Sequence, residues 1–85
     1  MGNKISEVIG YRDSKTNEGE RTGAFIVIFY ENNTATAILY EDGSDYVSNY
    51  SRTRALEECT FYMTKRWGKM SYEDIQQTTG IKFNS

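Results

Sequence analysis

The segment Ala24 to Tyr30, with the sequence AFIVIFY, constrains the fold of this 85-residue chain more than any other. Every residue in it except Ala24 is β-branched or aromatic, which is typical of a β-strand. Its apolar side chains occupy successive positions, so both faces of the strand are apolar. Such a strand must be central in its sheet and covered on each side, or it must lie at the seam of a dimer.

Three further segments have strand character: Glu7 to Asp13, Thr34 to Tyr40 and Asp45 to Tyr50. Residues 14–23 are polar and contain glycine, which predicts a loop. Glu31 to Asn33 is expected to form a turn, because Asn tolerates a positive φ. In the stretch Glu41 to Ser44, Gly43 supplies the left-handed position of a hairpin turn. The pattern therefore predicts an antiparallel meander of three or four strands.

The main helix is expected over Ser51 to Trp67, with Ser51 or Thr53 as its N-cap and Gly68 ending it. One broad stripe of this helix is predicted to pack on the sheet, and it contains Ala55, Leu56, Cys59, Tyr62, Met63 and Trp67. Cys59 lies at the centre of the stripe. We interpret it as a small buried residue rather than a reactive thiol.

A second, short helix is expected over Ser71 to Thr79. Ser71 and Asp74 approximate a capping box, and Gly80 closes the helix. Ile81 and Phe83 are expected to fold back on the core. The predicted fold is α+β: an antiparallel three- to four-stranded β-meander, one main helix packed on the sheet, and a short C-terminal helix, all in a single domain of residues 1–85.

Composition limits the chemistry, because the chain contains no histidine, no proline and one cysteine. It has no imidazole base, no Cys/His metal cluster and no internal disulfide. We therefore expect no cofactor, no metal and a non-enzymatic protein. A catalytic set without histidine, such as Tyr62, Lys65, Arg66 and Lys69, is available, but no spacing demands it. A lone thiol without a recognisable secretory leader predicts a cytoplasmic protein.

Two short motifs suggest other functions. The stretch SYEDIQQTTGIKF, from Ser71 to Phe83, resembles the first helix and turn of a helix-turn-helix DNA-binding unit, which implies DNA binding. Only five residues follow Gly80, so the recognition helix of that family has no counterpart here. Met1 to Ser6 fits the pattern for myristoylation of Gly2. One acyl chain binds membranes only marginally and no polybasic cluster supports it, so we expect no membrane attachment.

Charge is distributed unevenly along the chain. Residues 23–50 contain four carboxylates and no Lys or Arg, whereas residues 51–70 contain five basic and two acidic residues. The basic positions are candidate nucleic-acid contacts, with aromatic rings nearby for stacking: Arg52, Arg54, Lys65, Arg66 and Lys69. The acidic positions lie at predicted turns, where side chains are free to reach a basic partner.

These observations favour a small protein-binding module, an inhibitor or adaptor similar in character to those that phages deploy against host enzymes and defences. The expected partner is a host protein, for example a nucleic-acid enzyme with a basic groove. The residues expected to bind it are Glu31, Tyr40, Glu41, Asp42, Asp45, Tyr46 and Phe61. The alternative is a DNA- or RNA-binding protein that uses the basic helix. A homodimer is expected if one face of Ala24 to Tyr30 stays open.

Overall fold

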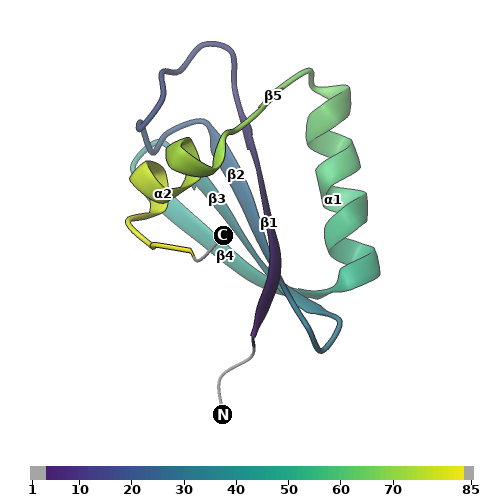
Figure 1. Ribbon diagram of the computed structural model, residues 1–85. Coiled ribbons are helices and arrows are strands. Elements are labelled where there is room, and N and C mark those ends of the chain that lie inside the picture. The colour runs from purple at the N-terminus through teal and green to yellow at the C-terminus, as the bar shows by residue number, and fades with distance from the viewer. Residues whose placement is uncertain (1–3, 84–85) are drawn as a thin grey trace.

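The computed structural model describes residues 4–83 and confirms the α+β fold (Figure 1). In chain order its elements are β1 (Ile5–Arg12), β2 (Ala24–Tyr30), β3 (Thr34–Glu41), β4 (Ser44–Ser51), α1 (Arg52–Thr64), β5 (Gly68–Lys69) and α2 (Tyr72–Thr79). The strands form one antiparallel sheet in the order β4-β3-β2-β1-β5. The strand predicted to be central is therefore third of five. The candidate myristoylation site at Gly2 lies outside the described residues.

The fifth strand is the main departure from the predicted meander. Gly68 and Lys69 leave the end of α1 and pair with Arg12 and Tyr11 of β1. The amide of Met70 extends this pairing by donating to the carbonyl of Gly10 at 2.8 Å. Two residues are too few to show strand periodicity in a sequence. This short strand carries the chain across the edge of the sheet, from the α1 face to the opposite face.

Helix α1 begins as predicted but ends earlier. Ser51 is the N-cap, and its hydroxyl accepts a hydrogen bond from the Arg54 amide. At the other end, Arg66 has a φ of 64°, its amide donates to the Met63 carbonyl, and the Trp67 amide donates to the Tyr62 carbonyl. This is a Schellman motif with arginine in the position that usually holds glycine. The prediction that Gly68 ends the helix is therefore wrong.

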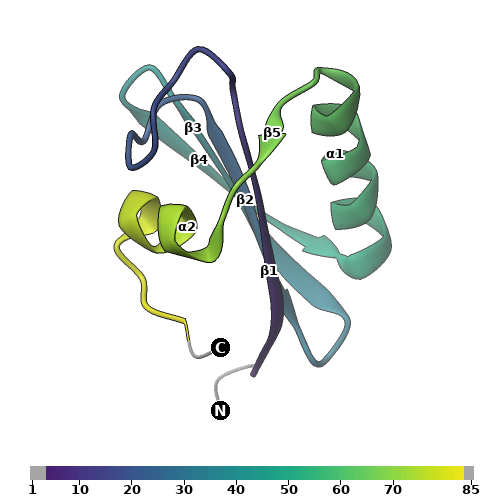
Figure 2. The same cartoon turned by 45° about the horizontal axis from the view of Figure 1, so that its top comes forward.

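Each face of the sheet has its own apolar core. Helix α1 covers one face, where Ala55, Cys59 and Tyr62 pack on residues from β1, β2 and β3. Helix α2 and the segment after it cover the other face, where Ile75 and Phe83 pack against Ile26 and Ile28. Figure 2 shows the two helices on opposite sides of the sheet. Neither face of β2 is open, so the condition for the expected homodimer is wrong. Phe83 folds back on the core as predicted, whereas Ile81 is 41% exposed and the prediction for it is wrong.

Helix α2 lies very close to β1 because the contact point is a glycine. A Cβ atom at Gly10 would lie 2.8 Å from the Met70 sulfur and 3.0 Å from Cγ1 of Ile75. Any larger residue would push α2 away from the sheet. Gly80 ends α2 at a φ of 75°, and its amide donates to the Gln76 carbonyl, as the sequence predicts. Neither helix within residues 4–83 has the length and apolar character needed to cross a membrane.

Candidate partner-binding surface

The β3–β4 hairpin presents the acidic end of the sheet. Asp42 and Gly43 form a two-residue turn, and both have positive φ, at 43° and 79°. These angles are those of a type I′ turn, whose twist matches that of the flanking strands. Glu41, Asp42 and Asp45 are all exposed around this turn. The Arg21 guanidinium, from the loop between β1 and β2, lies 3.5 Å from the Asp45 carboxylate.

Glu31 does not belong to this acidic end. It follows β2, at the opposite end of the sheet from Asp42, and its amide donates to the carbonyl of Lys4. The eight residues of β3 separate the two turns, which places them roughly 25 Å apart along the strand. The expectation that Glu31 shares one surface with the other three carboxylates is therefore wrong. Two hairpin turns that follow one another in sequence lie at opposite ends of an antiparallel sheet.

Tyr40 and Tyr46 were both expected to anchor a partner, and the structure separates them. Tyr40 is 5% exposed, so its ring is part of the core on the α2 side. Burial, and next the charge of Asp45, raise the pKa of its phenol. Tyr46 is 57% exposed and lies on the α1 face of β4. Only Tyr46 presents a free ring, so the prediction for Tyr40 is wrong.

A small groove of about 110 Å³ lies between α1 and strands β3 and β4. Half of its lining residues are aromatic, and the lining consists of Phe25, Ala37, Leu39, Tyr46, Ser48, Tyr50, Glu58 and Tyr62. Phe61 stands beside it, 52% exposed, with its ring 5.1 Å from that of Tyr62 in an edge-to-face contact. Tyr62 therefore links the exposed ring of the helix to the groove that Tyr46 borders.

Phe61 lies on a flank of α1 that also carries Arg54, Glu58 and Lys65. Arg54 is 3.3 Å from Glu58 and stacks over Tyr50 of β4, with its guanidinium 5.1 Å from the ring centre. The Lys65 ammonium lies 5.3 Å from the centre of the Phe61 ring. This row therefore faces the β4 edge of the sheet.

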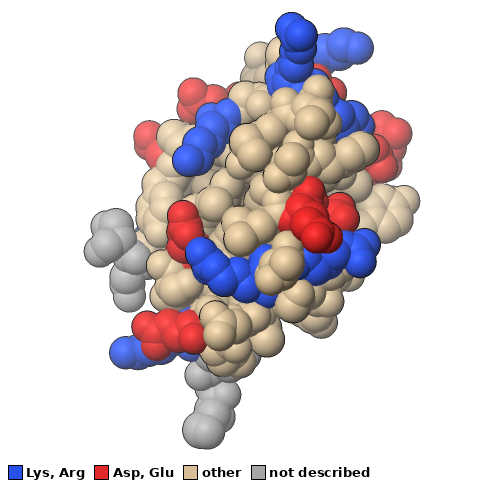
Figure 3. All heavy atoms as spheres, turned by 90° about the vertical axis from the view of Figure 1, so that its right-hand side faces the viewer, with Lys and Arg blue, Asp and Glu red and all other residues tan. Residues whose placement is uncertain are grey.

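The five basic residues proposed as nucleic-acid contacts do not form one stripe. Arg52 is 4.0 Å from Glu7, on the β1 side of α1, whereas Arg54 is on the β4 side. Lys65 lies over aromatic rings, and Arg66 and Lys69 follow the helix. Figure 3 looks onto the α1 side, where blue groups are separated by tan surface and by red carboxylates. The structure therefore spreads these charges over several directions.

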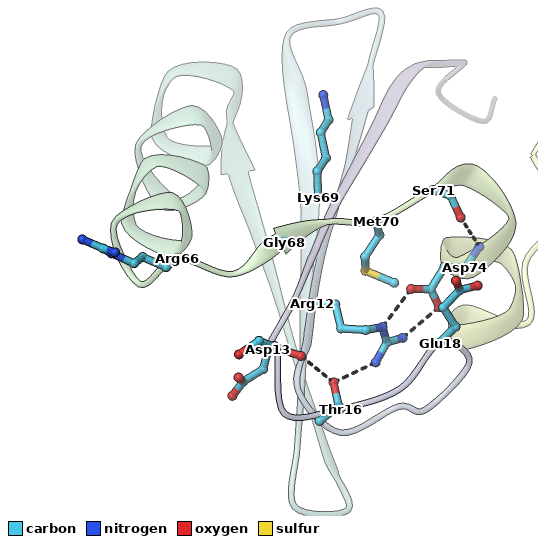
Figure 4. Close-up of a pocket in the computed structure, with 11 residues that line it drawn as sticks. Arg12, Asp13, Thr16, Glu18, Arg66, Gly68, Lys69, Met70, Ser71 and Asp74 are labelled. Atoms are coloured by element: carbon cyan, nitrogen blue, oxygen red, sulfur yellow. Dashed lines mark hydrogen bonds and ion pairs between the residues drawn. The ribbon is translucent and has the colours of Figure 1, made fainter.

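A larger cavity, of about 420 Å³, lies where β1, β5 and α2 meet. Its centre is an ion pair that the sequence did not reveal. Arg12 donates to both oxygens of Asp74, from Nε at 2.8 Å and from Nη2 at 2.9 Å (Figure 4). Thr16 and Thr78 accept the remaining hydrogen bonds of the guanidinium. The side chains of Arg66 and Lys69 point away from this pair.

Asp74 is 3% exposed, and four hydrogen bonds hold its carboxylate. Besides those from Arg12, it accepts from the Gly19 amide at 2.8 Å and the Thr78 hydroxyl at 3.2 Å. Burial alone would raise its pKa, but the hydrogen bonds and the charge of Arg12 outweigh burial, and the pKa is lowered. The pair binds β1, α2 and the β1–β2 loop together. Both members are satisfied by protein groups, so we assign them a structural role.

Cys59 is also internal, at 3% exposure in the core under α1. Burial and then the charge of Glu58 raise the pKa of its thiol to about 11. Both observations support the interpretation of Cys59 as a buried structural residue. Within residues 4–83, no three Cys, Asp or Glu side chains come together in a group that could hold a metal ion.

Comparison with known proteins gave no match to a protein-family model, a curated protein or a solved structure.

Proposed function

We propose that this chain is a non-enzymatic protein-binding module, acting as an inhibitor or adaptor on a host protein with a basic surface. Its binding surface is the acidic end of the β3–β4 hairpin together with the exposed rings beside it. The observation that supports this best is the combination of three exposed carboxylates, Glu41, Asp42 and Asp45, with an aromatic groove on the same hairpin.

The two parts of this surface have different roles in binding. Exposed carboxylates at a turn attract a basic partner over a Debye length of about 8 Å and so raise the association rate. The rings of Tyr46 and Phe61 are more than half exposed, and aromatic side chains carry much of the energy of interfaces once they are buried. We therefore assign steering to the carboxylates and anchoring to the two rings.

The first experiment is affinity capture from a native lysate, with and without nuclease treatment. A specific protein that remains after nuclease supports the proposal. Recovery that nuclease abolishes supports instead the alternative, nucleic-acid binding through α1. Binding kinetics with the captured protein then test which residues make the surface.

The decisive variants are Asp42→Lys/Asp45→Lys and a matched control, Glu31→Lys, which reverses an exposed charge at the other end of the sheet. We expect the double variant to slow association about tenfold at low salt, and the control to leave it within twofold. Tyr46→Ala should mainly accelerate dissociation, with a thermal melt close to that of the wild type because the ring is exposed. Equal association rates for the double variant and the wild type contradict the proposal.

A further inference from the structure

Strand β4 is an open edge of the sheet. Within residues 4–83 it pairs with β3 alone, over eight residues in continuous register, and most of its residues are exposed. Natural edge strands are usually protected by lysine, proline, a bulge or shortness. The opposite edge has such protection: β1 contains an irregularity between Ile5 and Glu7, and β5 covers its far end. The sequence of β4, SDYVSNYS, has only one charge, at Asp45.

The backbone groups that β4 directs outward follow from the pairing. In antiparallel sheets, residues alternate between those bonded to a neighbouring strand and those that face away from it. The Tyr40 carbonyl accepts from the Gly23 amide on the β2 side, whereas the Asn33 carbonyl accepts from the Arg52 amide on the β4 side. The odd-numbered residues of β3 therefore bond to the even-numbered residues of β4. Asp45, Val47 and Asn49 direct their amides and carbonyls to the open edge.

We propose that β4 pairs antiparallel with β4 of a second copy of this chain, so that two sheets join into one. Strand addition satisfies the free amides and carbonyls of an open edge. The alternation restricts the register, because outward-facing residues must meet outward-facing residues. Placing Val47 opposite Asn49 of the second copy satisfies this rule about a two-fold axis through Ser48.

The distribution of charge along β4 favours a second copy of this chain as the partner of its open edge. Acidic residues lie at one end of β4, with Asp42 in the turn before the strand and Asp45 near its start. A basic residue lies at the other end, where Arg54 of α1 contacts Tyr50 of β4. Antiparallel pairing brings the acidic end of one copy to the basic end of the other, twice in each dimer. The guanidinium of Arg54 already lies over Tyr50, on the flank of α1 that faces β4. In the proposed register Tyr50 is opposite Tyr46, so each Arg54 approaches the partner copy's acidic turn.

This pairing is compatible with the proposed function, although it does not rest on it. Edge pairing consumes backbone groups, whereas side chains stand roughly perpendicular to the sheet. The two-fold axis leaves both α1 helices on the same face of the joined sheet. The rings of Tyr46 and Tyr50 from both copies then form the floor of one wider groove between the two helices.

Sedimentation equilibrium of the full chain, from about 1 to 500 μM, tests the dimer. A single pair of strands is a small interface, so we expect a dissociation constant of roughly micromolar order for the wild type. Val47→Pro removes an outward amide without removing a bond to β3, and Val47→Ala is its matched control, since it loses the same exposed side chain and keeps the amide. We expect the proline variant to weaken the dimer about a hundredfold, and the alanine variant less than threefold.

A charge exchange tests the orientation. Asp42→Lys/Asp45→Lys and Arg54→Glu should each be monomeric alone, because each places like charges at both contacts. Mixed in equal amounts, they should form a heterodimer, since both contacts are again between opposite charges. Circular dichroism is the control for folding of each variant. If Val47→Pro does not fold, the charge exchange still tests the dimer.

Three results overturn the proposal: a strict monomer at 500 μM, a dimer that Val47→Pro leaves intact, and a mixture of the charge variants that stays monomeric. The first of these results, a strict monomer, is expected if the β4 edge instead binds an extended segment of a different protein. Failure of the dimer proposal can be distinguished from failure of the proposed protein-binding function. A Val47→Pro monomer that still binds the captured protein retains the function, and a dimer that binds no protein retains only the pairing.

Discussion

Removing the carboxylate of Asp74 is the perturbation whose effect the structure defines best. Asp74→Ala deletes the two carboxylate oxygens that accept from Arg12, one of which also accepts from the Gly19 amide. The arginine side chain is 9% exposed, so its charge would remain largely buried without a partner. Breaking a buried ion pair in this way costs about 3–5 kcal/mol. Because Arg12 borders a cavity that opens to solvent, we expect the lower end, about 3 kcal/mol.

For a domain of this size, a loss of about 3 kcal/mol lowers the melting temperature by about 12–24 °C. Glu58→Ala is the matched control, because it removes the carboxylate of the exposed Arg54–Glu58 pair. Such an i, i+4 surface pair contributes about 0.3–0.5 kcal/mol. Thermal and urea unfolding followed by circular dichroism measure both. If Asp74→Ala and Glu58→Ala destabilise the chain equally, the assigned structural role of the buried pair is refuted.

The same pair predicts how stability depends on pH. The pKa of Asp74 is lower in the folded chain than its ordinary value of 3.8. Its stabilisation is therefore complete above the unfolded pKa and is lost as the pH falls through the folded pKa. We expect the difference in unfolding free energy between the wild type and Asp74→Asn to shrink as the pH falls below about 4. In Arg12→Met, burial remains and the two bonds from Arg12 are lost, while those from Gly19 and Thr78 stay, so the pKa of Asp74 should be higher than in the wild type.

Two further predictions concern backbone strain and the thiol. Arg66→Gly should raise the melting temperature by about 4–8 °C, because arginine at a φ of 64° costs about 1 kcal/mol that glycine avoids. The control Lys65→Gly, at an ordinary helical φ of −77°, should lower the melting temperature. Thermal melts in which Lys65→Gly is more stable than Arg66→Gly contradict this reasoning. Cys59, buried with its pKa raised to about 11, should react with a disulfide reagent at neutral pH only as fast as the chain opens, so a rate close to that of the unfolded chain contradicts its burial.

The local features of the fold were predictable from the sequence because they depend on neighbouring residues. The bounds of β2, the two-residue turn at Asp42 and Gly43, and the caps Ser51, Ser71 and Gly80 all follow from short patterns. The end of α1 was not predictable, because a Schellman motif with arginine at its left-handed position has no composition signal. Glycine is the residue usually found at this left-handed position, so the pattern placed the helix end at Gly68, two residues after Arg66.

The features that depend on distant residues were not predictable in the same way. Arg12 and Asp74 are 62 positions apart, and each has an ordinary local explanation, in a strand and in the first turn of a helix. The sequence left open whether the second face of β2 is covered, because its cover is assembled from scattered residues: Met70, Ile75 and Phe83. Tyr40 and Tyr46 flank the same turn and look equivalent in sequence. Tyr40 is buried and Tyr46 is exposed because side chains alternate between the two faces of a sheet, which places Tyr40 toward α2 and Tyr46 toward α1.

The faces and edges of the sheet that the chain itself covers explain why we expect a partner to bind at β4. Helix α1 closes one face, α2 and Phe83 close the other, and β5 closes part of the β1 edge. The crossing from one face to the other uses the β1 edge, because the chain leaves α1 there to reach α2. That crossing leaves β4 without a cover within the described residues, although β4 borders the aromatic groove. An eight-residue edge with free amides, next to opposite charges at its two ends, is then the region where a second chain gains most by pairing.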